Sequence, residues 1–347
     1  MINFLKNYLS TLSIIFAAYL FYNSQNFYQN FLIKTNNLVF IDFSINTLDV
    51  FKTIIISYII LLIPFYLLYK ENSKARIIYN YIKNKIFLSN YKIKTKEKMA
   101  ILAWIVKLFF APLMIVWLTW HIFNLLNNVY LSYNDIQLIN TNFILFFNKH
   151  FFWLFFTLIL FFDVLLFTLW YLIEIPKLKN KILSVESTCL WWFVVLICYP
   201  PFNSYTTNLI WWYSTDFPQF INQYIHLFLN FSILILMWIY SWASIALWLK
   251  ASNLTNRWIV KKWPYKYIRH PAYFTKNMAW WIGWMPLLIS SISAWQIKHS
   301  LFIIFSLSTW TFIYYLRAIT EENHLSKDEN YLKYKEEVKY KFIPKVY

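Results

Sequence analysis

The chain has 347 residues, of which 60% are hydrophobic and 23% are aromatic, and its formal net charge is +17. A soluble domain of this length does not need so much apolar surface, whereas repeated apolar stretches of about 20 residues are typical of a polytopic membrane protein. The chain contains one glycine, Gly283, which excludes the glycine-rich loops that soluble nucleotide-binding folds use to approach phosphate groups.

Eight apolar stretches are candidates for membrane-spanning helices. They lie near residues 3–22, 51–69, 99–126, 151–172, 189–202, 224–249, 273–290 and 295–316. The shorter segments of alternating polarity that mark a transmembrane barrel are not seen. We therefore predict an all-α fold, a polytopic helical membrane protein with about eight transmembrane helices. Its C-terminal helical hairpin is followed by a charged cytoplasmic tail.

The basic residues divide unevenly between the loops that join these stretches. With the N-terminus in the cytoplasm, 27 of the 32 lysines and arginines fall on the cytoplasmic side and four on the other side. This distribution follows the positive-inside rule. It predicts a multi-pass protein of the bacterial inner (cell) membrane with cytoplasmic N- and C-termini. The basic loops are expected to contact anionic lipid headgroups rather than nucleic acid. The sequence predicts no oligomeric state.

Residues 1–188 form the predicted N-terminal transmembrane region, with about four helices and the basic cytoplasmic loop 70–98. Isoleucines and tyrosines interleave with the cations of this loop, which indicates an amphipathic segment at a membrane interface. Asp163 lies in the middle of the fourth stretch, where a carboxylate is costly in lipid and should face protein or water. It could pair with Lys107 of the third stretch, or serve a substrate or proton path. His121 is interpreted as structural.

Residues 189–347 form the second predicted region. Its first stretch is short, contains both cysteines, Cys189 and Cys198, and ends at Pro200-Pro201. Because the cysteines are nine residues apart in one predicted helix, they cannot form a disulfide with each other. No disulfide framework or metal motif is predicted.

A first polar block precedes the seventh stretch and contains Arg269, His270 and Pro271. Pro271 fixes its own φ and suits the first turn of a helix, so His270 is expected at a helix N-terminus. A cluster that anchors the chain among headgroups is the plainer interpretation of this block. Lys276 and Asn277, at the start of the same stretch, are a candidate site for a substrate headgroup.

A second polar block follows the eighth stretch and contains Arg317, Glu321 and Glu322. Arg317 and Glu321 are four residues apart, so an ion pair on a solvated helix face is one interpretation. A carboxylate cluster that faces a cofactor is the other. If the seventh and eighth stretches cross the membrane and return, His270 meets the two glutamates at one membrane face.

The two blocks together resemble the isoprenylcysteine carboxyl methyltransferase-like family, which includes phosphatidylethanolamine N-methyltransferases. The matching segments are Pro264-Tyr265-x-Tyr267-Ile268-Arg269-His270-Pro271-x-Tyr273, Arg317-x-x-x-Glu321-Glu322-x-x-Leu325 and Tyr331-x-x-Tyr334 with Phe342-Ile343-Pro344. The resemblance covers roughly residues 225–347, so residues 189–347 are interpreted as a methyltransferase-like transmembrane region with a cytoplasmic tail. The family often has glycine where this chain has Trp263 and Thr275.

The resemblance implies transfer of a methyl group from S-adenosylmethionine to a membrane-embedded or lipid-linked acceptor, a carboxylate or an amine. It implies a cofactor pocket that faces the cytoplasm and a lateral opening for the lipid-like substrate. The implied catalytic residues are Arg269 and Glu322, and no metal is expected. The implied cofactor-binding residues are Tyr267, Arg269, His270, Pro271, Tyr273, Glu321 and Glu322.

Two other functions stay open. Membrane reductases of sterols and related lipids have a similar C-terminal hairpin and use NADPH as the cofactor. A non-catalytic membrane partner could retain the same fold. The Arg-x-x-x-Glu-Glu spacing resembles the methyltransferases more, but a fold alone does not fix a function.

Overall fold

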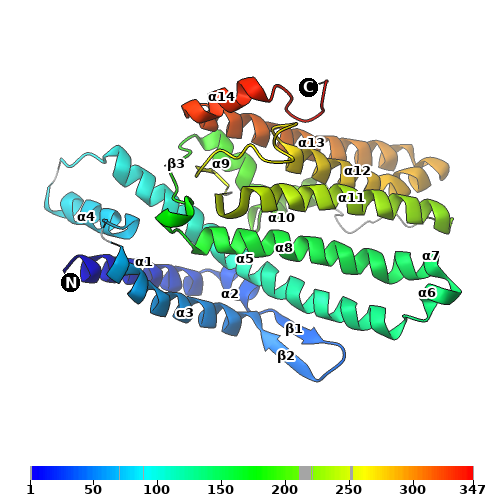
Figure 1. Cartoon of the computed structure of the whole chain (residues 1–347), viewed down its shortest axis with the longest axis horizontal. Coiled ribbons are helices and arrows are strands. Elements are labelled where there is room, and N and C mark those ends of the chain that lie inside the picture. The colour runs from blue at the N-terminus through cyan, green and yellow to red at the C-terminus, as the bar shows by residue number, and fades with distance from the viewer. Residues whose placement is uncertain are drawn as a thin grey trace.

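The computed structural model describes residues 2–69, 71–88, 90–210, 220, 222–250 and 253–346. Its long helices lie side by side in one elongated bundle (Figure 1). Six of the described helical segments are long and apolar enough to cross a membrane, because about 20 residues of helix span the hydrocarbon core. The structure therefore supports the predicted helical membrane protein.

The first half of the chain supplies four of these six segments. Asn46 and Ser73 accept backbone N–H groups in the first turns of α3 and α4, which satisfies donors that a helix start leaves unpaired. The elements are α1 (Ile2–Ser24), α2 (Asn26–Leu32), the antiparallel hairpin β1 (Thr35–Leu38) and β2 (Phe43–Asn46), α3 (Thr47–Leu68), α4 (Lys74–Phe87), α5 (Thr95–Asn134), α6 (Leu138–Thr141), α7 (Phe143–Phe146), a π-helical turn (Phe147–Phe151) and α8 (Phe152–Leu172).

The second half begins with short elements and ends with three long antiparallel helices. Pro271 is at the start of α12, as its fixed φ predicts. The elements are a 3₁₀ turn (Pro176–Leu178), β3 (Ser184–Val185), α9 (Cys189–Leu196), α10 (Phe202–Leu209), α11 (Gln223–Leu247), a second 3₁₀ turn (Trp248–Lys250), β4 (Thr255–Asn256), which pairs with β3, α12 (Pro271–Ser293), α13 (Ile297–Leu325) and α14 (Glu329–Glu337).

The predicted membrane-spanning helix over 189–202 is wrong. α9 ends at Leu196 and α10 begins at Phe202, with Pro200 and Pro201 between them. Proline has no N–H to donate to a continuing helix. Each of these helices has eight residues and is about 12 Å long, well short of the roughly 30 Å hydrocarbon core. α12, with 23 residues, is long enough to cross but is not among the six segments that are both long and apolar enough.

The segment after α13 folds back onto the bundle, whereas the sequence predicts a charged tail. Tyr331 and Tyr334 of α14 are buried and belong to a small apolar cluster with Ile259, Tyr265 and Leu325. The hydroxyl of Tyr334 donates to the backbone oxygen of Tyr265 at 2.7 Å. The C-terminal residues are thus part of the folded structure around the two polar blocks.

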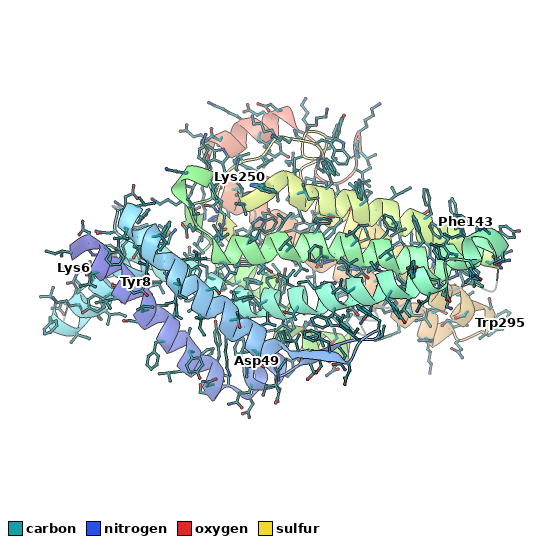
Figure 2. All side chains as sticks on the ribbon, turned by 60° about the horizontal axis from the view of Figure 1, so that its bottom comes forward. Lys6, Tyr8, Asp49, Phe143, Lys250 and Trp295 are labelled. Carbon is teal, nitrogen blue, oxygen red and sulfur yellow. The ribbon has the colours of Figure 1, made fainter. Side chains whose placement is uncertain are left out.

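The two ends of the bundle differ in character. The chain's N-terminus, α4 and β3 lie toward one end, and α6 and α7 form the other (Figure 1). Lys6 and Lys250 are found toward the first end, whereas Phe143 and Trp295 mark the second (Figure 2). Because the lysine-rich segments 74–88, 90–98 and 177–181 lie toward the first end (Figure 1), we call it the basic end. It corresponds to the face that the charge distribution predicts to be cytoplasmic.

Candidate functional site

The two polar blocks meet at the basic end, as the hairpin of α12 and α13 predicts. Arg269 donates its Nε–H to Oε1 of Glu322 at 2.6 Å, and Nε2 of His270 lies 3.1 Å from the same oxygen. All three side chains are buried. A carboxylate and a guanidinium that are removed from water must satisfy each other, because an unpaired buried charge is strongly unfavourable.

This cluster also holds the C-terminal segment. The Nη1 group of Arg269 donates to the backbone oxygens of Val338 and Lys339 at 2.7 and 2.8 Å. The backbone N–H groups of Arg269 and His270 donate to the oxygens of Tyr340 and Lys341, at 3.0 and 2.9 Å respectively. We call this arrangement the Glu322 clamp, meaning Arg269, His270, Glu322 and the segment 338–341. Its hydrogen bonds fix His270 at the entrance of α12.

Beside the clamp lies a cavity of about 170 Å³ between α8, α11, α12, α13 and α14. Arg269, His270, Tyr273 and Glu321 line it, whereas Tyr267, Pro271 and Glu322 are not among its lining residues. The side chain of Tyr267 is 52% exposed. We call it the tyrosine cavity because its wall contains Tyr199, Tyr240, Tyr265, Tyr273, Tyr314, Tyr331 and Tyr334.

Glu321 and Arg317 both face the tyrosine cavity but do not pair with each other. Glu321 accepts the hydroxyl of Tyr273 at 2.8 Å. The guanidinium of Arg317 lies 4.9 Å from the ring centre of Tyr314 and 5.3 Å from that of Tyr273, and it donates to Asn253 at 3.0 Å. The predicted ion pair on a solvated face is therefore wrong, because both side chains turn inward toward aromatic rings.

Lys276 enters the deep end of the tyrosine cavity from α12. Its ammonium lies 5.3 Å from the ring centre of Tyr240, 5.4 Å from that of Trp280 and 5.9 Å from that of Tyr314. Such contacts stabilise a desolvated cation through the negative face of each ring. The hydroxyl of Tyr240 donates in turn to Asp163 at 2.7 Å, which connects the lysine's surroundings to the buried carboxylate of α8.

Asp163 faces protein, as its cost in lipid predicts, but its partners differ from the predicted one. Ser244 donates to its second oxygen, so both carboxylate oxygens accept hydroxyl groups from α11. Lys107 instead pairs with Glu174 at 2.8 Å. The predicted pair of Lys107 with Asp163 is wrong because the two side chains bond to groups at different levels of the bundle.

A second, larger cavity of about 730 Å³ adjoins the deep end of the tyrosine cavity. Lys276 and Tyr314 line both cavities. His121 also lines the larger one, and its Nδ1 has no hydrogen-bond partner among the described residues. We call it the tryptophan chamber because its wall contains Trp117, Trp120, Trp153, Trp280, Trp284 and Trp310. Asn36, Asn124 and Asn128 are among the polar residues that also line it. An amphipathic molecule with a large apolar part suits a chamber of this composition.

The two departures from the family pattern lie outside the tyrosine cavity. Trp263 packs edge-on against Trp242 with a ring-centre distance of 5.7 Å. Thr275 is buried, and its hydroxyl donates to the backbone oxygen of Pro271 at 2.9 Å. Neither residue is among those that line the cavity, so neither side chain takes up its space.

Sequence reasoning missed a buried network that joins the loop after α8 to α13. Nδ1 of His324 lies 2.7 Å from Oε2 of Glu186, and its Nε2 lies 3.0 Å from Oγ of Ser184. The other oxygen of Glu186 accepts the backbone N–H groups of Ser187 and Thr188, both at 2.7 Å. Burial opposes the ionisation of Glu186, but these N–H groups and the nearby cations outweigh it and lower its pKa to about 2. No motif in the sequence signals this network.

The sequence also gave no signal for the tyrosines contributed by α11, α13 and the turn between α9 and α10. Tyr199, Tyr240 and Tyr314 lie within or beside apolar stretches, where aromatic residues are common in this chain. Their shared cavity becomes visible only when the helices are packed together. Comparison of the chain with known proteins gives no matching family model, no matching curated protein and no matching solved structure.

Proposed function

We propose that this chain transfers a methyl group from S-adenosylmethionine to a membrane-embedded or lipid-linked acceptor, a carboxylate or an amine. The observation that carries the proposal is the meeting of two cavities at Lys276 and Tyr314. The tyrosine cavity lies beside the two polar blocks, and the tryptophan chamber lies between the apolar helices. A water-soluble cofactor and an apolar acceptor need two such compartments that adjoin at the reacting atoms.

The lining of the tyrosine cavity fits the chemistry of this cofactor in two respects. Glu321 is a carboxylate, which accepts hydrogen bonds from hydroxyl groups such as those of a ribose. The tyrosine rings suit a positively charged sulfonium, as they suit the ammonium of Lys276. The volume of about 170 Å³ is below the roughly 300–1,000 Å³ of ligand pockets. The proposal therefore requires lining side chains to move on binding, beginning with Lys276.

The chain's own contribution would be mainly positional. Bound S-adenosylmethionine supplies the methyl group, and its sulfur leaves with the electron pair of the broken bond. Proton transfer is a small part of such a displacement, so alignment of acceptor and methyl group and exclusion of water carry most of the rate. Glu321 and Tyr273 line the cavity directly. Of the predicted catalytic pair, Arg269 also lines the cavity, whereas Glu322 does not line it and would act indirectly by holding Arg269 and His270.

Ligand-dependent stability of the purified protein tests this proposal. A ligand that binds the folded state raises the apparent melting temperature. We expect stabilisation by S-adenosylmethionine and by S-adenosylhomocysteine in detergent, and a loss of this effect in the Glu321→Gln variant. Glu336→Gln is the matched control, because Glu336 is exposed on α14 and does not line the cavity. Stabilisation of the wild type by NADPH alone would rule out the methyltransferase.

A second candidate function is reduction of a membrane lipid by NADPH, and the charge of the cavity wall favours it. Glu321 is the one carboxylate among the described lining residues. The cations that line the same cavity are Lys250, Arg257, Arg269, Lys276 and Arg317. Such a wall attracts phosphate groups, which NADPH carries and S-adenosylmethionine lacks. The same melting experiment separates the two cofactors, and no effect of either would support a non-catalytic partner.

A further inference from the structure

A third cavity lies at the basic end, between α3, α4, α5 and the loop that follows α8. Its volume is about 320 Å³, within the range of ligand pockets. None of its lining residues lines the tyrosine cavity or the tryptophan chamber. We call it the lysine cavity, because Lys74, Lys96, Lys107 and Lys181 line it. The proposed methyl transfer makes no use of it.

The buried wall of the lysine cavity carries more positive than negative charge. Lys74 and Lys107 both pair with the single carboxylate of Glu174, and the three side chains are only 11–14% exposed. Arg257 lines the tyrosine cavity and not this one, but it is close enough to act electrostatically on Lys74. It is almost fully buried and donates to the backbone oxygens of Asn180 and Trp170 rather than to a carboxylate. Near Glu174, three buried cations therefore share one carboxylate.

The excess of buried positive charge near Glu174 affects the protonation of Lys74. Burial lowers the pKa of Lys74 to about 8, and the neighbouring Lys107 and Arg257 act in the same direction, against Glu174. An anion in the cavity would oppose all three effects. At the mouth, Lys181 lies 3.1 Å from Glu71, in an exposed pair, and Lys96 lines the wall. Because Glu71 also lines the cavity and offsets Lys181, the further net positive charge of the exposed part of the wall comes from Lys96.

Asn72 and Ser73 add polar groups to the wall, but the part that α3 and α5 contribute is mainly apolar and aromatic and continues onto the outer surface of α3. Leu62, Phe65 and Met99 line the cavity. One turn from Phe65 on the same helix, Leu61 and Leu68 are 64% and 83% exposed. A free inorganic anion gains nothing from such a wall, whereas a lipid places its phosphate among the lysines and its chains along apolar helices. Basic pockets between membrane helices recognise lipid headgroups in this way.

We propose that the lysine cavity binds the phosphate headgroup of an anionic phospholipid, with its acyl chains along the exposed apolar face of α3. Lys74 and Lys107 hold the phosphate from below, and Lys96 and Lys181 hold it from the mouth. Ammonium groups bind phosphate as point charges, and the anion balances the buried excess of positive charge. This inference stands without the proposed methyl transfer.

Native mass spectrometry of the full chain in detergent, titrated with phosphatidylglycerol, tests the inference. The double variant Lys96→Gln/Lys181→Gln removes two exposed lysines of the cavity. The matched control, Lys92→Gln/Lys98→Gln, removes two exposed lysines at and just before the start of α5, near Lys96, that do not line the cavity. At about fivefold per lysine, we expect affinity to fall about twenty-five-fold in the first variant and less than about threefold in the control.

Three results would overturn the proposal. An equal loss in the control pair would mean that the basic end attracts anionic lipid without a defined site. Equal binding of phosphatidylcholine would mean that net negative charge is not recognised. Stabilisation by inorganic phosphate alone, at the concentration at which phosphatidylglycerol acts, would replace the lipid by a free anion. If Lys74→Met folds, as judged by its circular dichroism, it should also lose the preference for phosphatidylglycerol over phosphatidylcholine.

Discussion

Exchange of Glu322 for glutamine isolates the energetic role of the Glu322 clamp. The change preserves the size of the side chain and removes its charge. In the wild type, Oε1 of Glu322 accepts from Arg269 at 2.6 Å and lies 3.1 Å from His270 Nε2. After the exchange, the buried guanidinium of Arg269 keeps its two backbone oxygens but has no carboxylate to balance its charge.

Two estimates of the cost agree. A hydrogen bond to a charged group contributes about 1.5–3 kcal/mol, so weakening two of them costs about 3–6 kcal/mol. Removal of one partner from a buried ion pair costs about 3–5 kcal/mol. Because the glutamine oxygen still accepts one bond, we expect Glu322→Gln to lower the free energy of unfolding by about 3 kcal/mol. The segment 338–341 should also loosen, since the clamp holds it.

Denaturant-induced unfolding in detergent, followed by far-ultraviolet circular dichroism, measures this loss. Limited proteolysis reports on the C-terminal segment, where we expect faster cleavage in the variant. The control Glu336→Gln changes an exposed glutamate of α14 and should stay within about 0.5 kcal/mol of the wild type. A loss below about 1 kcal/mol in Glu322→Gln, with unchanged proteolysis, would refute the clamp.

Three further outcomes are expected. The pKa of Glu186 is about 2 in the folded chain against 4.5 ordinarily, so the stability that its ionised form contributes is present above pH 4.5 and is lost as the pH falls through 2. When the free energy of unfolding is measured against pH, the Glu186→Gln variant should lack this acid-dependent loss. A pH dependence equal to that of the wild type would contradict the low pKa of Glu186. Tyr240→Phe leaves one oxygen of Asp163 without its donor and should cost about 1–3 kcal/mol in the same unfolding assay; a neutral effect would show that the bond is not formed. Maleimide should label the exposed Cys189 faster than the half-buried Cys198, as measured by mass spectrometry of single-cysteine variants. The reverse order of labelling would contradict the position that the structure gives to α9.

The sequence allowed prediction of the helices and of the meeting of the two polar blocks, because both depend on length and polarity along the chain. A hairpin of two long apolar helices brings its ends together whatever its side-chain contacts are. His270 and Glu322 could therefore be placed near each other across 52 residues. The same logic failed at 189–202, where apolar composition indicated one helix and the two prolines separate two short ones.

Side-chain pairing could not be predicted, because it depends on the rotation of each helix about its axis. Spacing allowed Arg317 to pair with Glu321, yet in the fold Arg317 faces aromatic rings. The sequence did not decide which carboxylate would form an ion pair with Lys107. In the structure its partner is Glu174, from the loop after α8. A carboxylate in an irregular loop has no periodicity that would reveal its partner. The cavities could not be predicted either, since each is built from helices that are distant in sequence.

The contact of Arg269 and His270 with the segment 338–341 closes a long loop of the chain. The backbone oxygens that accept from the Arg269 side chain lie 69 and 70 residues after it, beyond the six described helices that are long and apolar enough to cross a membrane. Those six helices can therefore pack together without this contact, whereas Arg269 and His270, which line the tyrosine cavity, are held in place only when the segment docks. A variant that lacks the residues from 338 onward would keep its helices and leave both side chains without this support.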